Sequence, residues 1–311
     1  MSSYRFCRTD DVALLVDALN RCWAPYFPGE PPVTPASFKW SIRYLQVWCS
    51  SCMVAFSGSD PIGVLIGAKR PSGTLVHKIA VHPDHRRQGH GRHLLTSLSS
   101  KLAILGPPRM VAEVPETLAA GGGLFSASGY VQEAVLTDYV LPREENDLRS
   151  GEHGAGFVIP VTVDDLAANG LLGETDLQTC WERSVETLTA RKGDIAGLAV
   201  ASDERIEAYL LYDLEIWKSG NLEISQALAT ASALEAPDFQ ISKLPNFQIL
   251  SLRSFVDDGG ARLRQLLTRL GPGTFRFPKV HPMEVSTEVM ETLGFRPAGG
   301  HLLYVARARS E

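Results

Sequence analysis

The sequence predicts an α/β protein (α+β, with mixed sheets) that consists of two similar domains in tandem. Three observations carry this prediction. Short apolar segments with strand periodicity alternate with amphipathic helical segments in the order βααβββαβαβ, and a similar plan occurs twice. A polar, glycine-rich stretch at 143–156 separates the halves and is expected to be a linker. Two short sequences of the first half also have counterparts in the second.

The first domain is expected at residues 1–142. Leu15, Val16 and Leu19 recur at helical spacing, and Asp10 or Asp11 precedes them as a helix cap. Glycine- and proline-containing turns separate the apolar runs that follow, which therefore predict strands. The expected elements are a strand at 4–8, helices at 12–19 and 38–47, strands at 52–57, 61–69 and 74–81, a helix at 89–105, a strand at 110–114, a helix near 117–128 and a strand at 131–141.

The second domain is expected at residues 157–311. Residues 259–263 correspond to 89–93, and residues 292–295 correspond to 127–130, so the second half reads as a duplication of the first. The expected elements are a strand at 157–161, a helix capped by Asp164-Asp165, a helix at 177–188, strands at 195–201, 206–212 and 247–256, a helix, a strand at 274–280, a helix at 286–293 and a strand at 301–307.

Length and composition restrict the class of protein. The chain has 311 residues, which suit two domains, and its net charge of −5 argues against nucleic acid as a general partner. No run of 18 apolar residues predicts a membrane span, and the N-terminus has no apolar signal core. The five cysteines cannot all pair and have no disulfide-scaffold spacing. A reducing cytoplasm is therefore the expected location.

The most informative stretch is the strand at 75–81 with the turn and helix that follow it. The turn contains Arg86-x-x-Gly89-x-Gly91 and opens the helix. Glycines let the backbone approach a ligand closely, and the first N–H groups of a helix together with its dipole favour an anion. The pattern lacks the Lys-Ser/Thr of a P-loop and the third glycine of a Rossmann fingerprint. The sequence therefore predicts a phosphate site of another kind.

This stretch resembles the pyrophosphate loop of the GCN5-related N-acetyltransferases (GNAT), whose pattern is Gln/Arg-x-x-Gly-x-Gly/Ala. Val81-x-Pro83 before the loop and Leu94-Leu95 after it match at the same spacing. The resemblance implies a tandem GNAT protein that binds acetyl-CoA in its first domain, with an oxyanion-binding N–H at Val81 or its neighbour. The cofactor-binding residues it implies are Ala80, Val81, His82, Arg86, Arg87, Gln88, Gly89, His90, Gly91, Arg92 and Phe125.

The resemblance further implies direct attack of a primary amine on the thioester in a ternary complex. A substrate ammonium must first lose a proton, so a general base is expected. Glu113 matches a strand position where relatives carry a catalytic glutamate, and His77 is a candidate to relay a proton through water; Glu116 is a third candidate. A solvated strand glutamate and a structural histidine remain the alternatives. The expected acceptor is an amine on a small molecule or peptide, and the chain is expected as a monomer or homodimer.

Two features depart from the family pattern. Phe125 stands where relatives often have a tyrosine that protonates the leaving thiolate, and Leu118 where they often have an asparagine. A non-catalytic acyl-CoA-binding or sensing protein therefore stays as the alternative function. In the second half, Asp257 and Asp258 replace the arginine-rich entrance to the loop, and carboxylates repel a pyrophosphate. This half is expected to be degenerate and to bind no CoA in the usual mode.

Other patterns are given structural readings. His82, His85, His90 and His93 crowd the loop, but the family resemblance accounts for this region and no metal is expected. The Cys-x-x-Cys at 49–52 lacks a second pair and is expected to consist of buried thiols. Trp23 and Tyr26 follow the first helix, where they are candidates to line the acceptor site.

Overall fold

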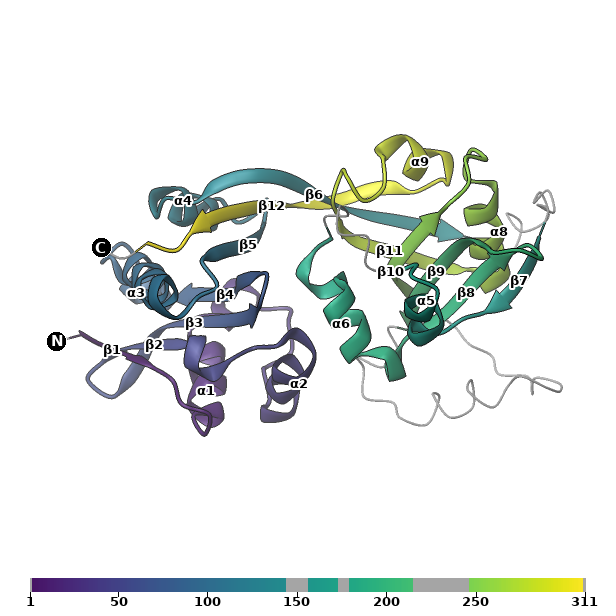
Figure 1. The fold of residues 1–311 in the computed structure, drawn as a ribbon. Helices are drawn as coiled ribbons and strands as arrows, with labels where there is room; N and C mark the ends of the chain where they lie inside the picture. The colour runs from purple at the N-terminus through teal and green to yellow at the C-terminus, as the bar shows by residue number, and fades with distance from the viewer. Residues whose placement is uncertain (1, 144–155, 173–178, 215–245, 310–311) are drawn as a thin grey trace, which may run out of the picture. The chain divides into compact units, whose positions relative to one another are not determined.

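The computed structural model describes residues 2–143, 156–172, 179–214 and 246–309. The expected linker at 143–156 therefore lies almost entirely outside the described residues. The chain divides into two compact units, Met1–Val135 with His301–Glu311, and Leu136–Gly300. Each unit contains its own part of the sheet (Figure 1) and has its own hydrophobic core.

The first unit is a mixed sheet in the order β1-β2-β3-β4-β5-β12. The central strand β3 is buried from Pro61 to Ala68, because helix α1 packs on it and helix α3 also contacts it. Leu94, Leu95 and Leu98 of α3 are buried, so the predicted apolar stripe of this helix faces the core. Its elements are β1 (Ser2–Phe6), α1 (Val12–Cys22), η1 (Ala24–Tyr26), α2 (Pro35–Leu45), β2 (Met53–Ser57), β3 (Asp60–Arg70), β4 (Gly73–Val81), η3 (Pro83–His85), α3 (His90–Leu105), β5 (Arg109–Pro115), α4 (Ala119–Ala127) and β6 (Val131–Arg143).

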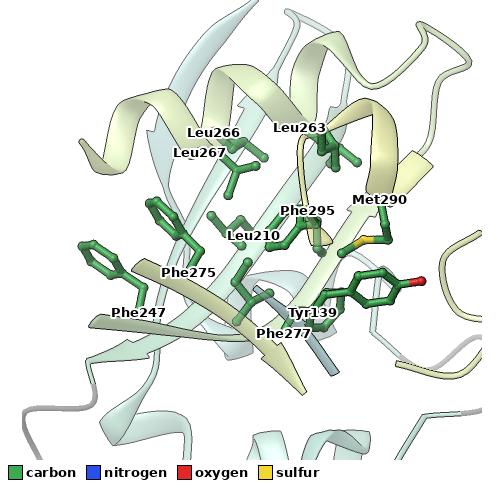
Figure 2. Packing of buried hydrophobic residues seen from close by; sticks show 14 of the residues in the cluster. Tyr139, Leu210, Phe247, Leu263, Leu266, Leu267, Phe275, Phe277, Met290 and Phe295 are labelled. Atoms are coloured by element: carbon green, nitrogen blue, oxygen red, sulfur yellow. The ribbon is translucent and has the colours of Figure 1, made fainter. Parts of the chain in front are cut away.

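The second unit repeats this element order, with a sheet in the order β6-β11-β10-β9-β8-β7. Figure 2 shows its main core, in which Leu263, Leu266 and Leu267 of α8 face Phe275 and Phe277 of β11. Its elements are β7 (Phe157–Pro160), α5 (Val163–Ala168), η5 (Trp181–Arg183), α6 (Val185–Ala190), β8 (Ala196–Ala201), β9 (Ile206–Leu214), β10 (Asn246–Ser254), α8 (Ala261–Leu270), β11 (Gly273–Val280), α9 (Thr287–Thr292) and β12 (Arg296–Arg307).

The helix expected at 177–188 differs from the structure. Residues 173–178 lie outside the described part, and η5 is followed by a separate helix, α6. The Ser184 side chain accepts a hydrogen bond from the Thr187 backbone N–H at 3.5 Å, which starts a new helix at this position.

The two long strands β6 and β12 each begin in one unit and end in the other, whereas the sequence halves place each strand wholly in one domain. The C-terminal part of β12 pairs antiparallel with β5, from His301 opposite Pro115 to Arg307 opposite Arg109. The C-terminal part of β6 pairs with β11 of the second unit. The unit boundaries therefore differ from those expected at 142 and 157. A strand's hydrophobic pattern shows which face is buried, but it does not show which sheet the strand joins.

Candidate functional site

The central feature of the first unit is a gap between two adjacent parallel strands. β4 and β5 pair only at Thr74 with Met110 and at Leu75 with Val111. Beyond these residues β4 continues to Val81 and β5 to Pro115 without further pairing to each other. Beyond these pairs the two facing edges form no ladder hydrogen bonds with each other, which is the geometry in which an extended ligand can bind between two parallel strands.

Val81 is the residue whose backbone faces this gap near the end of β4. The N–H of His82 donates to the Ile62 carbonyl of the neighbouring strand β3 at 2.9 Å. Successive residues of an extended strand turn their N–H and C=O groups to opposite edges, so the N–H of Val81 points to the β5 side. Val81 pairs with Gly63 of β3 in register, which fixes this orientation.

Tyr26 of η1 contacts the last residue of β4. Its hydroxyl donates to the Val81 carbonyl at 2.6 Å and accepts from Arg86 Nε at 2.7 Å. The Arg86 guanidinium also lies over the Tyr26 ring, with Cζ 4.4 Å from the ring centroid. One side chain thus joins the segment after α1, the last residue of β4 and the first arginine of the loop. Tyr26, predicted as a candidate to line the acceptor site, therefore contacts both the end of β4 and the loop that follows.

The loop after β4 leads into helix α3. Arg87 and Gly89 have positive φ angles of 60° and 87°, and Gly89 is the N-cap of α3. No described side chain accepts from the backbone N–H groups of His90, Gly91 or Arg92, so this helix N-terminus is open to an anion. A Cβ on Gly91 would lie 3.1 Å from Leu124 Cδ2, so a larger residue here would have to displace the Leu124 side chain of α4 by a few tenths of an ångström.

The polar side chains around the loop divide into exposed and inward-facing ones. Arg86, Arg87 and Arg92 are exposed, and an open groove runs along the first turns of α3 beside Gly89 and Arg92. These three cations give the loop the charge that suits a phosphate ligand.

His90 instead turns into the protein. Its Nδ1 lies 2.7 Å from Tyr4 Oη, a hydrogen bond that ties α3 to β1. Burial lowers the pKa of His90, and the neighbouring His85 and His93 lower it further. The imidazole is therefore neutral at physiological pH, and His90 contributes its backbone rather than its side chain to the open N-terminus.

Comparison with known proteins agrees with this geometry. Residues 14–122 match the model of the Acetyltransferase (GNAT) family. A tandem GNAT protein from the clavulanic acid biosynthesis pathway, solved without AcCoA, covers 100% of both chains at 17% identity and a TM-score of 0.60. A GNAT protein from Sphaerobacter thermophilus covers 99% of this chain and 96% of its own at 11% identity and a TM-score of 0.62. A putative acetyltransferase from Pyrococcus horikoshii covers 100% and 90% at 14% identity and a TM-score of 0.57. No curated protein matches the chain in sequence.

Residues 14–122 thus match the GNAT family, and the chain as a whole has the fold of tandem GNAT proteins. The predicted fold class, an α/β protein with two GNAT-like folds in tandem, is thereby confirmed. The gap between β4 and β5 and the open N-terminus of α3 form the candidate site of the first unit.

Of the three candidate bases, Glu113 and His77 lie on the strands that bound this gap, and Glu116 is exposed just after the end of β5. Glu113 is half-buried on β5, on the face opposite to the buried Ala112 and Val114. His77 is half-buried at a β-bulge, since Lys78 pairs with Ile66 while Val76 pairs with Gly67. The bulge interrupts the regular alternation of side chains along β4, so the strand pattern alone does not orient His77.

Phe125 lies in the core of the first unit, only 3% exposed. Its ring stacks on Tyr304 of β12 with centroids 5.8 Å apart, and it contacts Tyr130 edge-on at 5.0 Å. Tyr304 was not foreseen from the sequence, because β12 is distant in the chain and its pairing with β5 has no local signal. The Tyr304 hydroxyl lies 3.0 Å from the position that a Cβ on Gly122 would take. Gly122 therefore makes room for a hydroxyl beside the phenylalanine.

Three remaining sequence patterns have plain structural outcomes. Among the described residues, no group of three or more His, Cys, Asp or Glu is placed to hold a metal ion. Cys49 and Cys52 are buried thiols, and burial raises the pKa of both. Within the described ranges, no helix is long and apolar enough to cross a membrane.

Proposed function

We propose that the first unit binds acetyl-CoA and transfers its acetyl group to a primary amine. The observation that carries this proposal is the continuity of two features: the gap between β4 and β5 leads directly to the open, glycine-lined N-terminus of α3. An extended thioester arm fits the gap, and a pyrophosphate fits the helix N-terminus. The five buried thiols suit a reducing cytoplasm, and the acceptor is an amine on a small molecule or peptide.

In this proposal the backbone from Arg87 to Arg92 holds the pyrophosphate. The positive φ of Gly89 turns the chain into the helix, and Gly91 lets α4 approach. Arg86, Arg87 and Arg92 supply fixed positive charge at the rim, while Ala80, Val81 and His82 line the strand end beside the arm. Phe125, predicted as a cofactor-binding residue, is proposed to support the site from the core, where it is 3% exposed.

The chemistry needs a stabilised oxyanion and a deprotonated amine. The N–H of Val81 points into the gap, and one such donor contributes about 3 kcal/mol to lowering the barrier. Glu113 would accept the amine proton, directly or with His77 through water, which contributes roughly 10²- to 10⁴-fold. The amine attacks the thioester carbon within a ternary complex, the C–S bond breaks, and the thiolate leaves. A thiolate with a pKa of about 8.5 leaves acceptably without a donor at Phe125.

The proposal is tested in two steps. Calorimetry should show acetyl-CoA binding to the wild type, and a Gly89→Val/Gly91→Leu variant should lose it. Glu113→Gln should keep the affinity for acetyl-CoA while turnover of a responsive amine falls about 100-fold. Glu288→Gln, at an exposed glutamate of α9 in the second unit, is the matched comparison and should leave turnover unchanged. Absence of acetyl-CoA binding by the wild type would contradict the proposal.

One observation favours a second function, an acyl-CoA-binding protein without catalysis. Phe125 carries no proton donor at the position where relatives often have tyrosine. A broad amine panel separates the two functions: binding of acetyl-CoA without turnover of any amine supports the binding protein, and turnover that depends on Glu113 supports the enzyme.

A further inference from the structure

The second unit contains the same two features as the candidate site of the first. β10 and β11 pair parallel only at Asn246–Thr274, Phe247–Phe275 and Gln248–Arg276, and then separate. Helix α8 begins after a glycine N-cap, Gly260, with φ of 81°, where α3 begins after Gly89 with φ of 87°. The N-caps show that Gly260 corresponds to Gly89, one position on from the match expected from the sequence. Asp258 therefore corresponds to Arg87.

A carboxylate of the chain itself occupies the N-terminus of α8. Asp258 Oδ1 accepts from the N–H groups of Gly260 and Ala261 at 3.0 and 3.1 Å, and Oδ2 accepts from the N–H of Arg262 at 3.0 Å. The Arg262 side chain donates to Oδ2 as well, at 2.9 Å. Burial alone would raise the pKa of Asp258, but these hydrogen bonds outweigh it and lower the pKa. An anion held by three N–H groups and an arginine is the arrangement that a phosphate would require.

A guanidinium occupies the gap between the strands. Arg183 of η5 has a fully buried side chain and donates to Leu250 O of β10 at 3.4 Å. On the other edge it donates to Pro278 O at 2.8 Å and to Lys279 O at 2.9 Å. These residues lie just beyond the last β10–β11 pair, so Arg183 supplies donors to the carbonyl groups that the separation leaves. Glu284 neutralises it, with Oε2 2.7 Å from Nη2.

We propose that the second unit is a self-occupied copy of the acyl-CoA fold. Asp258 holds the position of the anionic ligand at α8, and the Arg183–Glu284 pair fills the gap where the first unit leaves room for an arm. From the sequence, Asp258 was expected to repel a pyrophosphate. In the structure its carboxylate takes the position at the N-terminus of α8 that a pyrophosphate would occupy. The occupation of the α8 N-terminus by the Asp258 carboxylate does not depend on the proposed function. The consequence that the chain has a single acyl-CoA site does rest on the proposed function.

The first experiment removes the carboxylate from the N-terminus of α8. In Asp258→Ala, three backbone N–H groups and Arg262 lose their carboxylate, so we expect faster amide hydrogen exchange in peptides covering 257–264. Millimolar inorganic phosphate should restore protection in this variant and leave the wild type unchanged. Asp258→Asn keeps an acceptor of the same shape, and should stay protected with no phosphate effect. It also keeps the test valid if the alanine variant unfolds.

Ser286→Ala is the matched control in the same unit. Ser286 caps α9 through Val289 N–H at 3.3 Å, without a preceding glycine pair of positive φ or an arginine. Its loss should speed exchange locally, and phosphate should not reverse this. The proposal is overturned if phosphate protects α8 in the wild type, or if phosphate fails to protect Asp258→Ala while that variant is folded.

The reciprocal experiment transfers the carboxylate to the first unit. Arg87→Asp places an acidic side chain two residues before the N-cap of α3, and should reduce acetyl-CoA affinity at least tenfold more than Arg87→Ser does. Calorimetry on the wild type should give one site per chain. Two sites would overturn self-occupancy. No site in any variant, with phosphate protection of Asp258→Ala intact, would refute the proposed function and leave self-occupancy standing.

Discussion

Replacement of Arg183 by methionine should strongly destabilise the second unit. The Arg183 side chain is 0% exposed and that of Glu284 is 6% exposed, so the substitution leaves a buried carboxylate without its counter-ion. Removing one partner of a buried pair costs about 3–5 kcal/mol. The carbonyl groups of Leu250, Pro278 and Lys279 also lose their donor, and an unsatisfied buried acceptor costs roughly 1–3 kcal/mol. We therefore expect a loss of at least about 4 kcal/mol, a large part of a domain's usual 5–15 kcal/mol.

Urea unfolding followed by tryptophan fluorescence measures this loss, because Trp181 is buried in the same η5 segment. The double variant Arg183→Met/Glu284→Met removes both charges, so it should be no less stable than the single variant. Asp164→Asn, which removes the exposed ion pair of Lys192, should cost less than about 1 kcal/mol. A single-variant loss below about 1 kcal/mol, or a double variant as costly as the sum of two singles, would refute the reasoning.

Three further outcomes are expected. Tyr26→Phe removes about 1 kcal/mol of hydrogen bonding at the end of β4, so kcat/KM should fall roughly fivefold while Tyr44→Phe on α2 leaves it unchanged; equal rates for both variants would show that the Tyr26 contacts do not matter. The folded-state pKa of Asp258 lies below its unfolded value, so its stabilisation is present above about pH 4 and disappears as pH falls through the folded pKa; the difference in Tm between wild type and Asp258→Asn should therefore close in acid, and a constant difference would contradict this. Burial raises the pKa of Cys22 to about 11, so this thiol should react with a disulfide reagent at pH 8 only after unfolding; rapid reaction of the native protein would disprove its burial.

The local elements of the candidate site were predictable from the sequence, because their causes are local. An apolar strand, a glycine of positive φ and a leucine stripe are readable over about 20 residues, and β4, Gly89 and α3 appear where these signals put them. The gap between β4 and β5 was not predictable from the apolar patterns of the two strands. Its physical cause is the pairing limit at Leu75–Val111, which no local pattern encodes.

Distant pairing accounts for what the sequence left out. Arg183 looked like any charged residue within the helix expected at 177–188, yet its partners lie on β10, on β11 and at Glu284. A buried arginine has no sequence signature, because burial depends on which carbonyl groups the fold brings around it. Asp258 was noticed for its charge, but its role depends on the positive φ of Gly260, which positions three N–H groups around the carboxylate.

The first unit depends on a strand from the C-terminal end of the chain. The last strand, β12, completes the sheet of the first unit at β5, and Tyr304 of this strand packs on Phe125 and is 6% exposed. A chain ending at residue 142 should therefore expose the β5 edge and leave a cavity in the core where the Tyr304 ring was. Loss of a large buried aromatic ring costs about 3–5 kcal/mol, and an unpaired inner strand edge promotes aggregation.

The truncated chain 1–142 should thus be aggregated or partly unfolded by circular dichroism and light scattering. Addition of a peptide spanning 296–309 should restore folding, whereas the same peptide with Tyr304→Ala should restore it poorly. A monomeric, cooperatively folded 1–142 that binds acetyl-CoA as the full chain does would show that β12 is dispensable. The expected dependence explains why a unit whose own ligand positions are filled stays in the chain: it carries the strand that the first unit requires.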